Sequence, residues 1–240
     1  MPRTVIAIGG NQESTAAAIN NALNAFRLDP QLNVLQSSNV YRSDPMGIDA
    51  GGRFLNAACL LESNLSAPDL LDLLQQVETD NDRIHETHWG PRTLDLDVIF
   101  YGDQILSSER LTVPHPHCWY RRFVLDPVAE ICPEWVHPAI GTTVADLRDR
   151  LHAEDFRVAV SGDVDPETLA SEFRQQFPGV RFENVTETTC PPAEGLGILV
   201  SDEPRELPPL WLRTTSLSLE PFVRDVLTAA RGQCHRLAPG

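Results

Sequence analysis

The chain has 240 residues, a hydrophobic content of 42% and a formal net charge of -15, from 34 acidic and 19 basic residues. This length and composition suit one large domain, or one domain followed by a smaller one, with a packed core. The acidic balance argues against nucleic-acid and membrane partners, because both of these surfaces are anionic.

The first half of the chain predicts strands that alternate with helices. A strand over residues 4–8 is expected to end in a turn at Gly9-Gly10-Asn11, and apolar spacing then predicts a helix over 14–27. Ser66, followed by Pro68, predicts the start of a helix that runs to about residue 83. The other expected strands are 32–41, 54–62 and 94–101. The resulting order β-α-β-β-α-β is that of a ferredoxin-like core.

The second half begins with Pro114-His115-Pro116, which predicts an extended loop, and with a short closing helix over 123–129. After residue 154 a new series of strands and helices begins. Strands are expected at 157–160, 180–184, 197–201 and 210–213, and helices at about 166–176 and 220–231. We therefore predict an α+β chain with two domains. Residues 1–154 form a ferredoxin-like βαββαβ core with additional C-terminal elements, and residues 155–240 form a small α/β domain.

Two carboxylates lie inside the last apolar strand of the predicted core. Because successive side chains of a strand alternate between its faces, Asp95 and Asp97 point the same way. Two unpaired carboxylates this close repel each other and are costly to bury. A divalent cation removes both costs, and hard oxygen ligands suit Mg²⁺ that is shared with substrate phosphates. On spacing alone, an edge strand whose acids face water is the other interpretation.

Five segments of residues 1 to about 150 together resemble the 6-hydroxymethyl-7,8-dihydropterin pyrophosphokinases of folate biosynthesis. They are Ile8–Asn11, Val40–Ser43, Phe54–Ala58, Trp89–Ile99 and Leu111–His115, with Arg121 and Phe123 beyond them. The segment Trp89–Ile99 is long and highly specific. The resemblance implies transfer of the β,γ-pyrophosphoryl group of ATP to the hydroxymethyl group of the pterin, which gives AMP and the pterin diphosphate.

The resemblance also implies a catalytic set of two acids and two arginines. Asp95 and Asp97 would hold two Mg²⁺ ions against the phosphates of ATP, because charge neutralisation and alignment dominate this chemistry. Arg83 and Arg92 would bind phosphate oxygens, which a guanidinium can grip in bidentate fashion. Without the family pattern, Arg83 would be interpreted as a solvated arginine at a helix end. The polar loop from Arg83 to Trp89 suits a lid that closes on nucleotide.

For the pterin, the resemblance implies an aromatic sandwich and a polar edge. A flat heteroaromatic ring needs aromatic faces and an amide that donates and accepts, and the family pattern assigns these to Phe54, Phe123 and Asn56. Outside that pattern, both phenylalanines would be interpreted as core residues. The expected pterin-binding residues are Ser43, Asp44, Pro45, Met46, Phe54, Asn56, Trp89 and Phe123.

The ATP-binding residues likewise follow from the resemblance. His115, in its Val-Pro-His context, is expected near the phosphates, and Glu78 near the base of the lid. The sequence has no Walker A loop, and Gly9-Gly10-Asn11 is not a dinucleotide fingerprint. The expected ATP-binding residues are Glu78, Arg83, Trp89, Arg92, Arg110, Thr112, His115 and Arg121.

Several positions depart from the family pattern. Gly10 replaces a common serine, a change that we expect a turn to tolerate. Asp44 stands where proline is common and adds a negative charge near the pterin edge. His85 and His88 replace arginine or lysine in the lid, so ATP would bind more weakly, or more tightly below the histidine pKa. The two metal ligands and the two key arginines are retained.

The C-terminal extension is too short for dihydroneopterin aldolase or dihydropteroate synthase, although folate enzymes are sometimes fused in one chain. We expect a structural or self-association module at 155–240, and a regulatory ligand-binding role stays open. The alternative function for the whole chain is a non-catalytic pterin- or nucleotide-binding protein with a C-terminal interaction module. The intact acids and arginines argue against this alternative.

The cysteines and the N-terminus bear on location. The five cysteines are scattered and odd in number, which favours neither a disulfide framework nor a zinc site. The apolar run over residues 5–8 is too short for a secretion signal or a membrane span. We therefore predict a soluble, cytoplasmic protein, whose oligomeric state does not follow from the sequence.

Overall fold

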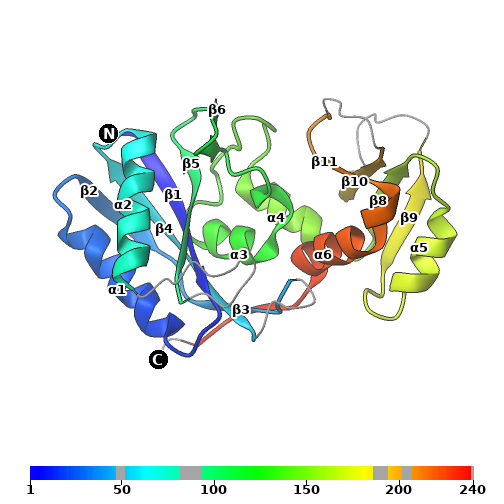
Figure 1. Cartoon of the computed structure of the whole chain (residues 1–240), viewed down its shortest axis with the longest axis horizontal. Helices are drawn as coiled ribbons and strands as arrows, with labels where there is room; N and C mark the ends of the chain where they lie inside the picture. The colour runs from blue at the N-terminus through cyan, green and yellow to red at the C-terminus, as the bar shows by residue number, and fades with distance from the viewer. Residues whose placement is uncertain (47–51, 82–92, 186–193, 202–206, 239–240) are drawn as a thin grey trace.

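The computed structural model describes residues 1–46, 52–81, 93–185, 194–201 and 207–238. Within this part of the chain, strands form a six-stranded antiparallel sheet, a four-stranded parallel sheet and a two-stranded hairpin. Figure 1 shows the two larger sheets at opposite ends of the molecule, with helices between them. The mixture of helices and strands expected from the sequence is confirmed.

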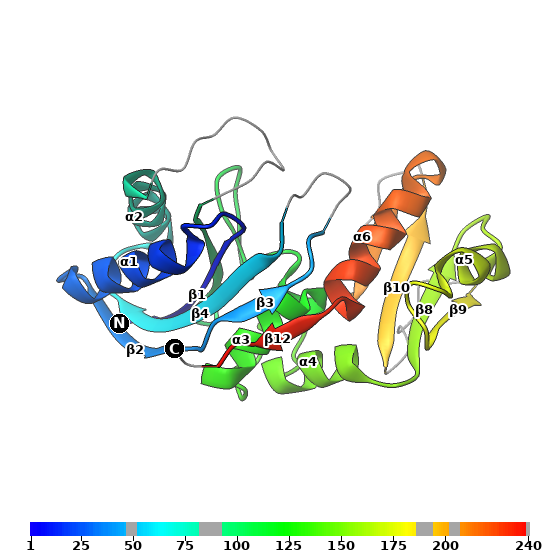
Figure 2. The ribbon, with the colours of Figure 1, turned by 90° about the horizontal axis from the view of Figure 1, so that it is seen from below.

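The first sheet has the strand order β12-β3-β4-β1-β5, with β2 also paired to β4. Its strands are β1 (Arg3–Gly10), β2 (Leu32–Ser37), β3 (Tyr41–Ser43), β4 (Phe54–Ser63), β5 (Asp95–Tyr101) and β12 (Cys234–Arg236). Two helices, α1 (Thr15–Leu28) and α2 (Ala67–Asp80), cover one face (Figure 2), where they pack on Ile6, Ile8 and Leu61. A third helix, α3 (Arg122–Ile131), packs on the opposite face.

Local interactions explain where these elements begin and end. The helix α2 starts at Ser66 as expected, because the Ser66 hydroxyl accepts a hydrogen bond from the Asp69 N–H at 3.3 Å. The strand expected over 32–41 is two strands, since the Ser38 hydroxyl accepts from the Ala58 N–H at 2.8 Å and the Asn39 side chain bonds Glu130. The Ser38 N–H still donates to the Ala58 carbonyl at 2.9 Å, but the return bond from Ala58 goes to a side chain, which interrupts the backbone ladder between β2 and β3.

The expected turn at Gly9-Gly10 was wrong, because both glycines belong to β1. They pair with Asn56 and Leu55 of β4. The strand leaves little room at position 10 for the serine that Gly10 replaces. A Cβ atom on Gly10 would lie 2.5 Å from the Thr93 carbonyl oxygen and 2.7 Å from the Thr15 hydroxyl oxygen, so a side chain would force the backbone apart.

The second sheet is parallel, with the order β11-β10-β8-β9. Its strands are β8 (Phe156–Ser161), β9 (Val180–Asn184), β10 (Gly195–Val200) and β11 (Trp211–Thr214). Helices α5 (Pro166–Phe173) and α6 (Leu219–Arg231) accompany it, and η2 (Ser216–Ser218) precedes α6. Besides α3, the elements that lie between β5 and β8 along the chain are β6 (Leu106–Ser107), β7 (Thr112–Val113), η1 (Cys118–Tyr120) and α4 (Val144–His152). The sequence had indicated all four strands of the second sheet, and it had missed α4.

One apolar cluster runs from the first sheet to the second. It joins Val5 of β1, Leu125 of α3, Leu147 of α4, Val158 of β8 and Leu227 of α6, all of them buried. The chain ends back in the first sheet, because β12 pairs with β3. Residues 234–236, expected in the small C-terminal domain, therefore belong to the sheet of the N-terminal part. The division into domains 1–154 and 155–240 stays a prediction.

We predict that substitution Leu227→Ala destabilises the whole chain rather than one part of it. Leu227 is fully buried in the shared cluster, so the loss should be about 2–5 kcal/mol of unfolding free energy. Urea unfolding followed by tryptophan fluorescence and circular dichroism should give one coincident transition at lower urea. Leu217→Ala, at a position that is 98% exposed, should change the urea concentration at the midpoint of this transition little. Two separate transitions, with only one displaced by Leu227→Ala, would contradict the shared core.

Candidate active site

A row of residues crosses the middle of the first sheet. The register places Gly9 of β1 opposite Asp95 of β5 on one side and opposite Asn56 of β4 on the other. Directly opposed residues of antiparallel strands carry their side chains on the same face. A Cβ atom on Gly9 would lie 3.4 Å from the Asn56 side-chain oxygen, so the missing side chain leaves space between the amide and the carboxylate. Gly9, which the sequence assigned to a turn, thus lies between two expected site residues.

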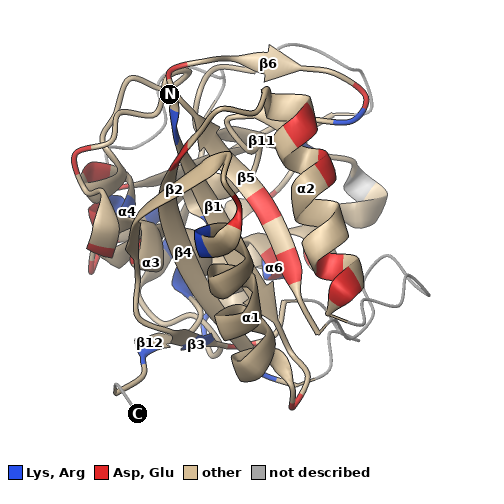
Figure 3. Ribbon diagram, turned by 90° about the vertical axis from the view of Figure 1, so that its left-hand side faces the viewer, with Lys and Arg blue, Asp and Glu red and all other residues tan. Residues whose placement is uncertain are grey.

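Asp95 and Asp97 lie on the face of β5 that points away from α2. The intervening Leu96 and the following Val98 are buried against the α1 and α2 side, whereas both aspartates are half-buried. Figure 3 shows the two acidic positions of β5 on an otherwise uncharged strand. In the described sheet β5 is an edge strand, as the solvent-facing interpretation required. Both acids are nevertheless half-buried, unlike carboxylates that are fully exposed at the surface.

Glu78 of α2 supports the backbone between the two aspartates. Its side chain is only 3% exposed, and its Oε1 accepts a hydrogen bond from the Leu96 N–H at 2.7 Å. A buried N–H on an edge strand needs such a partner, because an unsatisfied one is costly. The observed contact of Glu78 is thus with β5, and contact with ATP stays a prediction.

A second group of polar side chains holds the residues just before β5. The Thr15 hydroxyl donates to the Thr93 carbonyl at 3.1 Å and accepts from the Gln12 N–H at 3.0 Å, while the Thr93 hydroxyl donates to Gln12 Oε1 at 2.9 Å. Gly10 lies against the same atoms. These contacts fasten the start of β5 to the start of α1. Sequence reasoning missed them, because residues this far apart show no local pattern.

The expected pterin-binding residues come from three elements. On β4, Phe54 and Asn56 share a face, and the Asn56 Nδ2 donates to the hydroxyl of Ser43 at 2.9 Å, both side chains being buried. Phe123, at the start of α3, is half-buried and packs against the shared apolar cluster, as does Met46. Asp44 and Pro45 follow β3 directly and are half-buried. The structure therefore brings β3, β4 and the start of α3 to one region.

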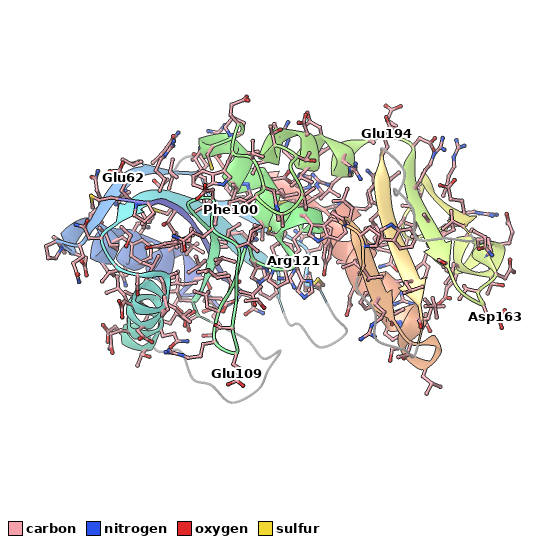
Figure 4. All side chains as sticks on the ribbon, turned by 90° about the horizontal axis from the view of Figure 1, so that it is seen from above. Glu62, Phe100, Glu109, Arg121, Asp163 and Glu194 are labelled. Carbon is pink, nitrogen blue, oxygen red and sulfur yellow. The ribbon has the colours of Figure 1, made fainter. Side chains whose placement is uncertain are left out.

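The expected ATP-binding residues His115 and Arg121 lie close to one another. Burial, together with the positive charge of Arg121, lowers the pKa of His115 to about 4. His115 Nδ1 accepts from the His117 N–H at 3.2 Å, and the His115 N–H donates to the Ile99 carbonyl at 3.0 Å. Arg121 has its guanidinium carbon 5.7 Å from the centre of the Phe123 ring. Figure 4 places Arg121 in the middle of the molecule, between the first sheet and α6.

Two further expected residues lie on or near the β6–β7 hairpin. Thr112 is in β7 and is half-buried. Arg110 forms an ion pair with Asp72 of α2, in which both side chains are more than half exposed. Arg110 is thus held toward α2. Arg83, Trp89 and Arg92 lie outside the described residues, as do the lid histidines His85 and His88.

The comparisons with known proteins decide the family. A family model for 7,8-dihydro-6-hydroxymethylpterin-pyrophosphokinase (HPPK) matches residues 5–133. The chain belongs to this family. A 2-amino-4-hydroxy-6-hydroxymethyldihydropteridine pyrophosphokinase from Pseudomonas aeruginosa is 42% identical over 55% of this chain and 82% of its own length. One from Synechocystis is 41% identical over 61% of this chain and 75% of its own length.

Membership of the HPPK family makes the chain a pyrophosphokinase of folate biosynthesis, as the sequence predicted. The matched region ends just after α3, so the elements from α4 to β12 lie beyond it. A solved Plasmodium falciparum HPPK-DHPS chain has a TM-score of 0.49 and 10% identity over 83% of this chain and 64% of that chain, a likeness too low to assign the extension. No helix among the described residues is long and apolar enough to cross a membrane.

We predict that Glu78→Ala loosens β5, whereas Glu78→Gln largely preserves it. Alanine leaves the Leu96 N–H buried without its acceptor, which should cost about 1–3 kcal/mol of unfolding free energy. Glutamine keeps a side-chain oxygen in reach and serves as the matched control. Urea unfolding, with hydrogen exchange of the Leu96 amide, measures both effects. Equal exchange rates in the wild type and the alanine variant would refute the supporting role.

We predict that His115 stays neutral down to mildly acidic pH. Its pKa in the folded protein is about 4, below the ordinary 6.5, so the unfolded chain binds this proton more tightly. The contribution of neutral His115 to the free energy of unfolding is present in full above about pH 6.5 and is lost as the pH falls toward 4. Ring nitrogen chemical shifts measured by NMR should therefore not titrate between pH 8 and about 5.5. In His115→Gln, stability should fall less steeply over the acid range, and a midpoint near 6.5 for His115 would show the prediction to be wrong.

Proposed function

We propose that this protein transfers the β,γ-pyrophosphoryl group of ATP to 6-hydroxymethyl-7,8-dihydropterin. The hydroxymethyl oxygen forms a bond to the β-phosphorus, the bond from that phosphorus to the α-phosphate oxygen breaks, and AMP leaves as the hydroxyl proton is lost. Family membership supports this assignment. The observation that carries it is the row Asp95, Gly9 and Asn56. In this row the carboxylate of Asp95, on the proposed phosphate side, is two strand spacings, roughly 10 Å, from the amide of Asn56, on the proposed pterin side.

The finer fold assignment is part of the same proposal. We infer that β1, β3, β4 and β5, with α1 and α2, form a ferredoxin-like core. The antiparallel order β3-β4-β1-β5 supports this inference, as does the packing of α1 and α2 on a single face.

Asp95 and Asp97 fit the Mg²⁺ that this chemistry requires. Among the described residues, His, Cys, Asp and Glu form no group of three or more that could hold a metal. Two carboxylates on one strand face instead suit an ion that takes its other ligands from water and substrate phosphates, and we expect two such ions. When bound, Mg²⁺ would neutralise phosphate charge and align the phosphates with the hydroxyl. The protein's part is to hold the two carboxylates at fixed separation on β5.

On the pterin side, the amide of Asn56 is oriented before substrate arrives. One N–H of its nitrogen donates to Ser43, and its oxygen lies toward Gly9, where it would accept from an N–H of the pterin. Phe54 and Phe123 would provide the two aromatic faces. The remaining proposed pterin-binding residues are Asp44, Pro45, Met46 and Trp89.

On the ATP side, a neutral histidine and an arginine would bind phosphate oxygens. Because His115 Nδ1 accepts from His117, its Nε2 carries the proton and is a donor at neutral pH. Arg121 has a buried Nε without a hydrogen-bond partner among the described residues, so this atom is able to donate to a ligand. Arg83 and Arg92 would supply the remaining positive charge. Glu78, Trp89, Arg110 and Thr112 stay proposed members of the nucleotide site.

The location and assembly of the protein are also proposals. A reducing, cytoplasmic compartment fits the buried free thiols of Cys59, Cys118, Cys132 and Cys234. Self-association through residues 155–240 stays a prediction.

We predict that Asp97→Asn lowers the rate of AMP release about 100-fold or more, because a neutral amide is a poor ligand for Mg²⁺ in phosphoryl transfer. The assay contains purified protein, ATP, Mg²⁺ and hydroxymethyldihydropterin, with AMP and ADP separated by ion-exchange chromatography. Asp103→Asn, at an exposed position just beyond the same strand, is the matched control and should leave the rate unchanged. Release of ADP by the wild type, or no turnover, would sink the proposed function.

A further inference from the structure

The last strand of the chain lies against the strand that leads into the expected pterin-binding segment. Cys234 pairs with Ser43, His235 with Arg42 and Arg236 with Tyr41 in an antiparallel ladder. Figure 2 shows β12 alongside β3, after the chain has returned from the second sheet through α6. Residues that follow β3 in sequence therefore meet residues that precede β12.

Asp44 forms two hydrogen bonds with Gln233. Its N–H donates to the Gln233 carbonyl at 3.1 Å, and its Oδ2 accepts from the Gln233 N–H at 3.2 Å. Proline, which is common at this position in the resembling family, has neither an N–H nor a carboxylate. The departure at position 44 thus matches a partner that lies in the C-terminal extension. The charge that the sequence analysis placed near the pterin edge is turned toward Gln233 and toward Arg53, whose Nε is 3.8 Å from Oδ1.

The same C-terminal segment also holds α3, which carries Phe123. Arg122 donates to the Gly232 carbonyl at 3.1 Å, and Arg236 lies 3.6 Å from Glu130. Cys234 forms a hydrogen bond with Asp126, whose charge adds to the effect of burial in raising the pKa of this thiol to about 12. The three contacted residues of α3 recur every fourth position, so they share one face of the helix. The segment Gly232–Arg236 therefore bridges β3 and α3.

The second sheet and α6 hold this bridge at its start. The Gly232 N–H caps α6 by donating to the Thr228 carbonyl at 2.9 Å, and a Cβ atom on Gly232 would lie 2.3 Å from that carbonyl oxygen. Helix α6 buries Val223 and Leu227 in the cluster that it shares with α3. The position of residues 233–236 is thus set by the packing of the whole extension.

We propose that Gly232–Arg236 is a positioning element for the pterin-binding side of the site, an inference that rests on the proposed function. By bonding Asp44 on one side and α3 on the other, it fixes the backbone after β3 relative to Phe123. A segment held in its binding conformation loses less entropy when ligand binds, so the bridge strengthens pterin binding. The extension thereby has a part in substrate binding without contacting the substrate.

The test is a double-mutant cycle across the Asp44–Gln233 contact in the full-length protein. Gln233→Pro removes the N–H that donates a hydrogen bond to Asp44. The preceding Gly232 has φ -59° and ψ 164°, a backbone conformation that is compatible with a following proline. Asp44→Ala removes the acceptor. The probe is hydroxymethyldihydropterin, with its Kd from fluorescence titration and its KM from AMP release.

Each single variant should raise the Kd and KM for the pterin about threefold to tenfold, the effect of losing one hydrogen bond. The double variant should be no worse than either single variant, because both remove the same contact. The KM for ATP should stay at the wild-type value. Asp44→Asn, which keeps a side-chain oxygen, should restore most of the affinity.

The matched control is His235→Ala on the same strand. His235 is exposed, and its backbone ladder survives the substitution, so pterin binding should be unchanged. Additive losses in the double variant, an equal rise in the KM for ATP, or no loss in either single variant would overturn the positioning role. These outcomes are distinct from failure of the proposed function, in which the wild-type protein itself releases no AMP.

Discussion

The register of β1 between β4 and β5 is the constraint on which the site depends. It sets Asp95, Gly9 and Asn56 in one row, with Asp97 opposite Ala7 in the next. Because side chains alternate along a strand, a slip of one residue in β5 would turn both carboxylates toward α1 and α2. That face is filled by apolar side chains, where two uncompensated charges would be prohibitively costly. The apolar packing of the sheet therefore enforces the polar arrangement on its other face.

Both sides of the four strands β3-β4-β1-β5 are held by further contacts. At one edge, Glu78 satisfies the Leu96 N–H of β5, and at the other, β12 pairs with β3. Unpaired sheet edges fray and associate with other chains, so a binding site built across a sheet gains precision when its edges are covered. The family region provides the first of these contacts, and the extension provides the second.

The parts of this arrangement that the sequence could predict are those with a local period. Alternation in β5 indicated that Asp95 and Asp97 share a face, and β9 spans Val180–Asn184 as expected. The helix α4 was missed because only Val144, Leu147 and Leu151 are buried among charged neighbours. The strand β12 has three residues and no pattern of its own, and its existence depends on a partner strand near the opposite end of the chain. The turn expected at Gly10 was wrong for a similar reason, since the place of Gly10 in β1 depends on pairing with the distant Leu55.

A net charge of -15 raises the question of how this chain would bind a triphosphate. Interactions between exposed charges are largely screened beyond about 8 Å at physiological ionic strength, so the remote surface acids contribute little at the site. The groups within that range decide the local potential. His115 offers a donor while remaining neutral, because desolvation opposes its protonation beside Arg121. The positive charge on the proposed ATP side of the site therefore rests on arginine, and a guanidinium does not lose its proton in the physiological range. Nucleotide affinity should then vary little with pH through His115, and any strong pH dependence near neutrality must come from other groups.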